Sequence, residues 1–115
     1  MRRMLVLVGV VAGCGRPALA PEAARVEAQK IWKERCVTCH GPTGNGDGPG
    51  AKILPVRPRN LGDVHWQRDT SDERIAQVIV DGGRSVGLDS NMAANPDLKK
   101  KPEVVLALVE LVRGL

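Results

Sequence analysis

Five consecutive residues carry the strongest chemical signal in the chain: Cys36-Val37-Thr38-Cys39-His40. Residues three and four apart lie on the same face of a helix, so both thiols can meet one ligand. The imidazole that follows the second thiol can then reach a metal at the centre of that ligand. This spacing is typical of covalent c-type haem attachment. We therefore expect one haem c, with thioether bonds to Cys36 and Cys39 and with His40 as the proximal iron ligand.

The same residues allow other interpretations, which the surrounding sequence does not favour. A redox Cys-x-x-Cys motif normally belongs to a βαβ unit, and no such pattern is present. A zinc site could use Cys36, Cys39, His40 and His65, but adjacent Cys39 and His40 bind one tetrahedral ion awkwardly. A disulfide between the two cysteines would close a very short loop. A zinc-binding or thiol-exchange module stays as the alternative to haem.

Three amphipathic helices, separated by Gly/Pro-rich loops, are expected to position the motif. The first covers about Glu22 to His40, and its apolar residues recur at helical spacing: Ala24, Ala28, Ile31 and Trp32. The second is expected to begin at Thr70, because Thr70 and Glu73 have the spacing of a capping box. It ends at Gly82, which can adopt the left-handed conformation that follows a helix. Its buried residues are expected to be Ile75, Val78 and Ile79.

The third helix opens with Pro102 as a first-turn residue. Its apolar stripe is expected to consist of Val104, Leu108, Leu111 and Leu115, flanked by Val105 and Val112. The pattern contains no credible strand pair, so it predicts an all-α fold with long loops around one haem. Residues 41–50 are rich in glycine but fit neither a dinucleotide fingerprint nor a phosphate loop. We interpret them as tight turns that let the backbone pass close to a flat ring.

The composition is consistent with a domain built around a cofactor. The chain has 115 residues, enough for one domain, and has no Phe and no Tyr beside Trp32 and Trp66. So small a domain is marginally stable without a metal or cofactor. Two of its 17 Lys and Arg residues, Arg2 and Arg3, lie in a segment that we expect to be removed. The remaining basic side chains nearly balance the charge of the 13 Asp and Glu residues. This balance excludes a nucleic-acid binder, and we interpret Lys99-Lys100-Lys101 as a solvated surface.

The N-terminal residues are typical of an export signal. Arg2 and Arg3 precede an apolar stretch, Met4 to Val11, that is too short to span a bilayer. The segment Val11-Ala12-Gly13-Cys14 resembles the lipobox of bacterial lipoproteins, which implies that residues 1–13 are removed and that Cys14 is lipidated. Residues 14–21 are then a tether and residues 22–115 the domain. We expect a protein exported to the periplasmic side of a bacterial membrane; a plain signal peptide is the alternative.

Beyond the motif, the chain from about Glu22 to Leu115 resembles the class I cytochromes c, the small single-haem kind. Trp32 lies four residues before Cys36, where that family has an aromatic residue, and Ala28 lies four residues earlier still. The resemblance implies a first helix packed across the last one. It also implies a distal methionine ligand in the loop that precedes the last helix.

Met92 is the candidate for that distal ligand, because it is the one methionine that remains without the signal and lies in the non-helical stretch Gly82–Pro96. A thioether ligand stabilises reduced iron, which suits electron transfer. His65 is the rival axial ligand. Arg59 and Trp66 are candidate contacts to the haem propionates, because each carries N–H donors. A surface arginine and a core tryptophan are the other interpretation of these two residues.

The resemblance implies a single-electron carrier in a respiratory or related redox chain, and no enzyme. With both axial positions filled by protein, the iron has no open site for a substrate. The implied partners are redox proteins: a membrane oxidoreductase, a terminal oxidase or a periplasmic dehydrogenase. The membrane is a further partner through the lipid. The alternative is a haem-based sensor or a catalytic haem protein with a displaceable distal ligand.

Overall fold

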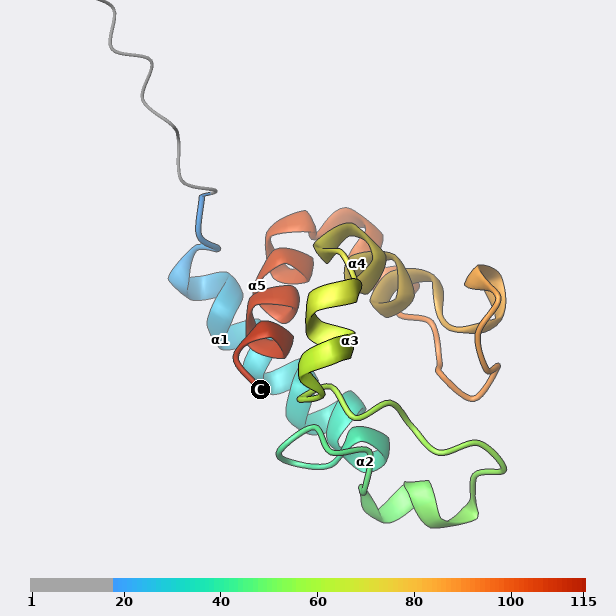
Figure 1. Cartoon of the computed structure of the whole chain (residues 1–115). Helices are drawn as coiled ribbons and strands as arrows, with labels where there is room; N and C mark the ends of the chain where they lie inside the picture. Colours follow the sequence, from blue (N-terminus) through green and yellow to red (C-terminus); the bar gives the residue numbers. More distant parts are fainter. Residues whose placement is uncertain (1–17) are drawn as a thin grey trace, which may run out of the picture.

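One interrupted helix carries the Cys-x-x-Cys-His motif in the computed structural model, which describes residues 18–115 (Figure 1). It consists of α1 (Glu22–Ile31), a π-helical turn (Trp32–Cys36) and α2 (Val37–His40). The helix predicted from Glu22 to His40 is therefore confirmed. The π-helical turn was not predicted; such turns are rare and frequently occur at functional sites.

The residues just before α1 are packed on the domain. Ala20 is buried, and its N–H donates to Oε1 of Glu110 at 2.8 Å. Arg25 in α1 donates from Nε to Oε2 of the same carboxylate at 3.2 Å. Glu110 therefore fixes the point where the chain enters the domain. The expected signal peptide and the lipidated Cys14 lie outside the described residues.

The last helix, α5 (Pro102–Arg113), lies against α1, as the resemblance implied. Ala28 and Leu108 are 1% and 2% exposed and belong to one apolar cluster. The buried residues of α5 are Val104, Ala107, Leu108, Val109 and Val112. The predicted stripe is thus wrong at its C-terminal end, where Leu111 is half-buried and Leu115 is 38% exposed. The buried stripe is broader because α5 packs against both α1 and α4 (Asp72–Asp81).

The second predicted helix is α4, which ends before Gly82 at a positive φ of 75°, as expected. The predicted capping box is wrong. Ser71 is the N-cap, and its Oγ accepts from the N–H of Arg74 at 3.1 Å. Thr70 is instead the C-cap of the preceding helix: its N–H, which a capping box would offer to the Glu73 side chain, donates to the carbonyl of Trp66. Ile75 is buried as predicted, while Val78 and Ile79 are half-buried.

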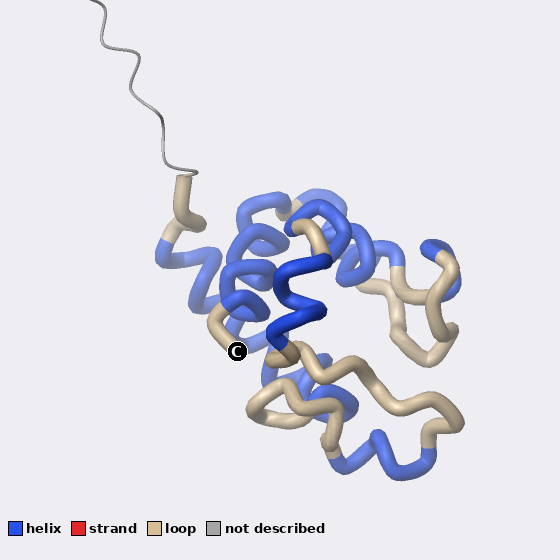
Figure 2. Tube along the Cα trace, in the orientation of Figure 1, coloured by secondary structure: helices blue, strands red, loops and turns tan. Residues whose placement is uncertain are grey.

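That preceding helix, α3 (Val64–Asp69), is a short element that was not predicted from the sequence (Figure 2). It starts because the carboxylate of Asp63 accepts from the N–H of Trp66 at 2.8 Å. Gln67 then joins α3 to α5: its Nε2 donates to the carbonyls of Leu61 and Val112 at 2.6 and 2.8 Å. No strand is found over residues 18–115, so the all-α prediction is confirmed. In the same part of the chain, no helix has the length and apolar character needed to cross a membrane.

Candidate haem-attachment site

Cys36 and Cys39 lie where the π-helical turn passes into α2. Both are half-buried and both are free thiols. The Sγ of Cys36 lies 3.9 Å from the carbonyl oxygen of Ile31, the residue before the π-helical turn. Burial raises the pKa of Cys36 to about 11, so this group is a protonated thiol at neutral pH. Cysteines that exchange disulfides have lowered pKa values, and the thiol-exchange interpretation therefore finds no support here.

The imidazole of His40 is oriented by a carbonyl group. Its Nδ1 lies 3.0 Å from the carbonyl oxygen of Arg59. Because a carbonyl only accepts hydrogen bonds, Nδ1 carries the proton and Nε2 keeps its lone pair. Burial lowers the pKa of His40, although the hydrogen bond to the Arg59 carbonyl has the opposite effect. The lowered pKa favours the neutral imidazole, which is the form that binds metals. The ring also stacks on Trp32, with centroids 6.5 Å apart.

The glycine-rich loop that follows His40 folds back onto α2. The N–H of Gly46 donates to the carbonyl of His40 at 2.8 Å, and that of Gly48 donates to Cys39 at 3.1 Å. A Cβ at Gly48 would collide with the carbonyl oxygens of Val37 and Thr38. Glycine is thus needed for the backbone of the loop to approach the backbone of the helix. These bonds satisfy the last carbonyls of α2, which would otherwise lack partners.

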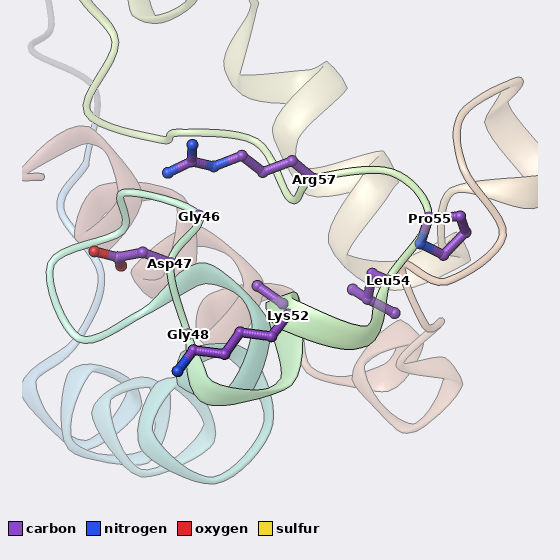
Figure 3. A pocket seen from close by; sticks show the side chains of 8 residues that line it. Gly46, Asp47, Gly48, Lys52, Leu54, Pro55 and Arg57 are labelled. Atoms are coloured by element: carbon purple, nitrogen blue, oxygen red, sulfur yellow. The ribbon is translucent and has the colours of Figure 1, made fainter.

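An open cavity of about 400 Å³ lies in the segment that continues from this loop (Figure 3). It is lined by Gly46, Asp47, Gly48, Ala51, Lys52, Leu54, Pro55 and Arg57. None of the predicted iron or thioether residues lines it. The cavity therefore adjoins the attachment site without including its donor atoms.

Met92 lies on a different part of the chain, in the loop between α4 and α5, and is half-buried. Its carbonyl accepts from the N–H of Gly83 at 2.9 Å, and its own N–H donates to Asp89 at 3.3 Å. In Figure 1 this loop (orange) lies to the right of the helices, and the green segment before α3 extends to the same side from below. His40, at the end of α2, and Met92, in the loop between α4 and α5, thus come from two separate parts of the chain.

The other predicted site residues have different surroundings. His65 is exposed in the first turn of α3. Arg59 is exposed as well, and the contact that it makes to the site is through its carbonyl, which the sequence did not signal. Trp66 is half-buried against an apolar cluster that includes Trp32 and Ile75. Across residues 18–115 no three Cys, His, Asp or Glu side chains gather as a metal site would require, so the zinc interpretation gains no support.

The residues present fit a covalently bound haem c. Cys36 ends the π-helical turn, and Cys39 lies three residues later in α2. Both free thiols therefore come from one helical run, as thioether formation with one ring requires. The histidine that follows them offers Nε2, because Nδ1 is already engaged. This donor set matches the thioether and proximal-ligand chemistry of c-type haem.

Comparisons with known proteins lead to the same family. The cytochrome c family pattern matches residues 26–115. Among solved structures, the c-type cytochrome KustC0563 is 38% identical, with a TM-score of 0.56 over 76% of this chain and 94% of that one. A point mutant of KustC0563 matches with the same identity and TM-score over 95% of its chain. A comparison with curated proteins gives no significant match. The chain belongs to the cytochrome c family.

Proposed function

We propose that this cytochrome carries single electrons, with haem c attached at Cys36 and Cys39 and with His40 and Met92 as the axial ligands. The observation that carries the proposal is the state of His40, whose Nδ1 is held by the Arg59 carbonyl, so that Nε2 is left to bind a metal, and which directly follows two free thiols in the chain. When bound, the haem supplies a one-electron iron(III)/iron(II) couple.

Met92 supports a carrier because a thioether favours reduced iron and raises the midpoint potential. A protein ligand on each side leaves little to rearrange when an electron arrives or leaves. Met92 is half-buried in a loop, where it belongs to neither of the two apolar clusters of the described residues. A core role therefore does not account for it.

The test is the pair of variants Met92→Ala and His65→Ala. Oxidised wild-type protein should show the weak long-wavelength band of a thioether–iron(III) bond. We expect Met92→Ala to abolish this band, to lower the midpoint potential and to admit carbon monoxide. His65→Ala should change none of these, because His65 is exposed on α3. If His65→Ala alone changes the spectrum, the ligand assignment is wrong; rapid binding of carbon monoxide by the wild type would favour a sensor or an enzyme.

The proposed setting is the periplasmic side of a bacterial membrane, with partners that are larger redox proteins. The support is the sequence alone: a signal-like segment followed by Cys14 in a lipobox-like context. Cys14→Ser should abolish fatty-acid labelling and release the protein from membranes. Wild-type protein that is unlabelled and fully soluble after export would contradict lipidation.

We also propose that the exposed guanidinium of Arg59 and the indole N–H of Trp66 contact the haem propionates.

A further inference from the structure

Arg35, the residue directly before Cys36, is bound to the segment that follows Met92. Its Nη1 donates to Oδ1 of Asn95 at 3.1 Å and to the two carboxylate oxygens of Asp97 at 3.0 and 3.1 Å. These residues lie 60 and 62 positions away in the sequence. A side chain of the haem-attachment helix thus reaches the far side of the proposed site.

Asn95 connects this contact to the base of the Met92 loop. Its Nδ2 donates to the carbonyl of Ile79 at 2.8 Å, and its N–H donates to the carbonyl of Val80 at 3.0 Å. Ile79 and Val80 belong to the last turn of α4, so Asn95 caps the helix from which the loop departs. Asn95 therefore marks the point where the loop closes on itself, three residues after Met92.

The loop itself has few other links to the rest of the molecule. Among residues 18–115, the remaining hydrogen bonds of positions 83–94 stay within the loop or reach α4, as when Arg74 donates to the carbonyl of Val86 at 2.8 Å. None of them reaches the helix that carries His40. The contact made by Arg35 is thus one hydrogen-bonded link between the segment after Met92 and the helical run that carries His40; Lys101, which donates to Glu27 of α1 at 2.6 Å, is a second one further along the chain.

We propose that Arg35, Asn95 and Asp97 form a latch that holds the Met92 loop closed and slows the loss of Met92 from the iron. The inference rests on the proposed role of Met92 as distal ligand. Arg35 is a positioning residue in this scheme, because it contacts Asn95 and Asp97 at the base of the loop and acts on the ligand through them. A methionine on a loop leaves when the loop opens, and any opening that moves the base of the loop at Asn95 must break the hydrogen bonds of the latch.

The size of the effect follows from the exposure of the charged pair. The side chains of Arg35 and Asp97 are 41% and 50% exposed. The hydrogen bond from Arg35 lowers the pKa of Asp97, so the carboxylate is charged throughout the neutral range. Exposed pairs are weak and are screened by salt. We therefore expect the latch to change the rate of Met92 loss about two- to fivefold.

The experiment measures imidazole binding to the oxidised, haem-loaded protein by stopped-flow absorbance, at saturating imidazole. Under this condition the rate of loss of the thioether band reports loop opening. Asp97→Asn should raise the rate about two- to fivefold. The matched control is Asp72→Asn, which removes the same charge from a pair with Arg113 (2.7 Å) at the opposite end of α4. This control should leave the rate unchanged.

High salt gives an independent readout, since about 1 M salt shortens the screening length to about 3 Å. The wild-type rate should then rise toward that of Asp97→Asn, while the variant changes little. Arg35→Gln tests the same contact from the helix side and should resemble Asp97→Asn. Equal rates in all proteins, or equal acceleration by Asp97→Asn and Asp72→Asn, would overturn the latch. If the wild type lacks the thioether band, it is instead the proposed function of Met92 that fails.

Discussion

The two sides of the proposed haem site are built differently. His40 ends a helical run of residues 22–40, and three main-chain groups fix its surroundings: the carbonyl of Arg59 and the N–H groups of Gly46 and Gly48. Met92 lies on a loop whose hydrogen bonds are mostly internal and whose Leu88 is 52% exposed. The protein therefore holds the proposed proximal ligand, His40, more firmly than the proposed distal ligand, Met92. If Met92 binds the iron, this is the bond whose strength substitutions in the surrounding loop can change most readily.

The largest expected effect comes from removing the proposed covalent attachment on the His40 side. Cys36→Ala/Cys39→Ala should lose covalent haem and much of its helix, because this small aromatic-poor domain buries little apolar surface without the cofactor. Intact mass and circular dichroism measure both losses, and Cys14→Ala should keep the haem. Cooperative unfolding of the double variant at near wild-type stability would show that the domain, including its His40 side, folds without the cofactor.

A pair of loop variants compares how tightly the two sides are packed. Gly48→Ala should lower the free energy of unfolding by about 2–3 kcal/mol, because the new Cβ meets the carbonyls of Val37 and Thr38. Leu88→Ala, in the Met92 loop, should change it by less than about 0.5 kcal/mol, because this side chain is half exposed. Urea unfolding of both haem-loaded variants gives the values. Similar losses would contradict the contrast between the two loops.

A smaller effect is expected at the start of α4, the helix that ends at the Met92 loop. Ser71→Ala should cost about 1 kcal/mol of unfolding free energy, because Ser71 Oγ accepts from Arg74. Thr70→Ala is the matched control and should cost less, since Thr70 does not cap this helix. The comparison uses equilibrium denaturation at pH 7. If Thr70→Ala lowers the free energy of unfolding more than Ser71→Ala does, Thr70 caps α4, as the sequence predicted.

The smallest effect concerns pH and the N-cap of α3, beside the His40 loop. The hydrogen bond from Trp66 N–H holds the pKa of Asp63 below its usual value of 3.8. A lowered folded-state pKa stabilises the protein above about pH 3.8, and this contribution is lost as pH falls through the folded value. Asp63→Asn should remove that dependence while keeping a good cap at neutral pH. Urea unfolding between about pH 3 and pH 7 checks whether the stability difference between wild type and variant narrows in acid.

The sequence predicted the parts of the molecule that depend on side-chain type and spacing. The motif at Cys36–His40 indicated the cytochrome c family, and helical periodicity predicted the run from Glu22 to His40 and the helix from Pro102. Gly82 was correctly expected to end α4 because few residues other than glycine adopt its positive φ. The family comparison agrees with these expectations.

Features that depend on main-chain groups or on distant contacts escaped prediction. The carbonyl of Arg59 orients His40, and every residue has a carbonyl, so no sequence signal marks this one. The π-helical turn likewise has no composition of its own. Ser71 rather than Thr70 caps α4, because Thr70 is the C-cap of α3, a helix that was itself unexpected. The bond from Arg35 to Asp97 joins positions 62 residues apart, which no local pattern can connect.

The carboxylate of Glu110, which accepts hydrogen bonds from Ala20 and Arg25, limits how far the domain of the proposed membrane-bound protein can move from the bilayer. Since the chain is held from Ala20 onward, only the five residues between the proposed lipid site and Ala20, 15–19, can act as a tether. The six residue steps from Cys14 to Ala20 span at most about 20 Å. The domain would then search for partners within a thin layer above the bilayer, and a partner in bulk solution would have to enter that layer to exchange an electron.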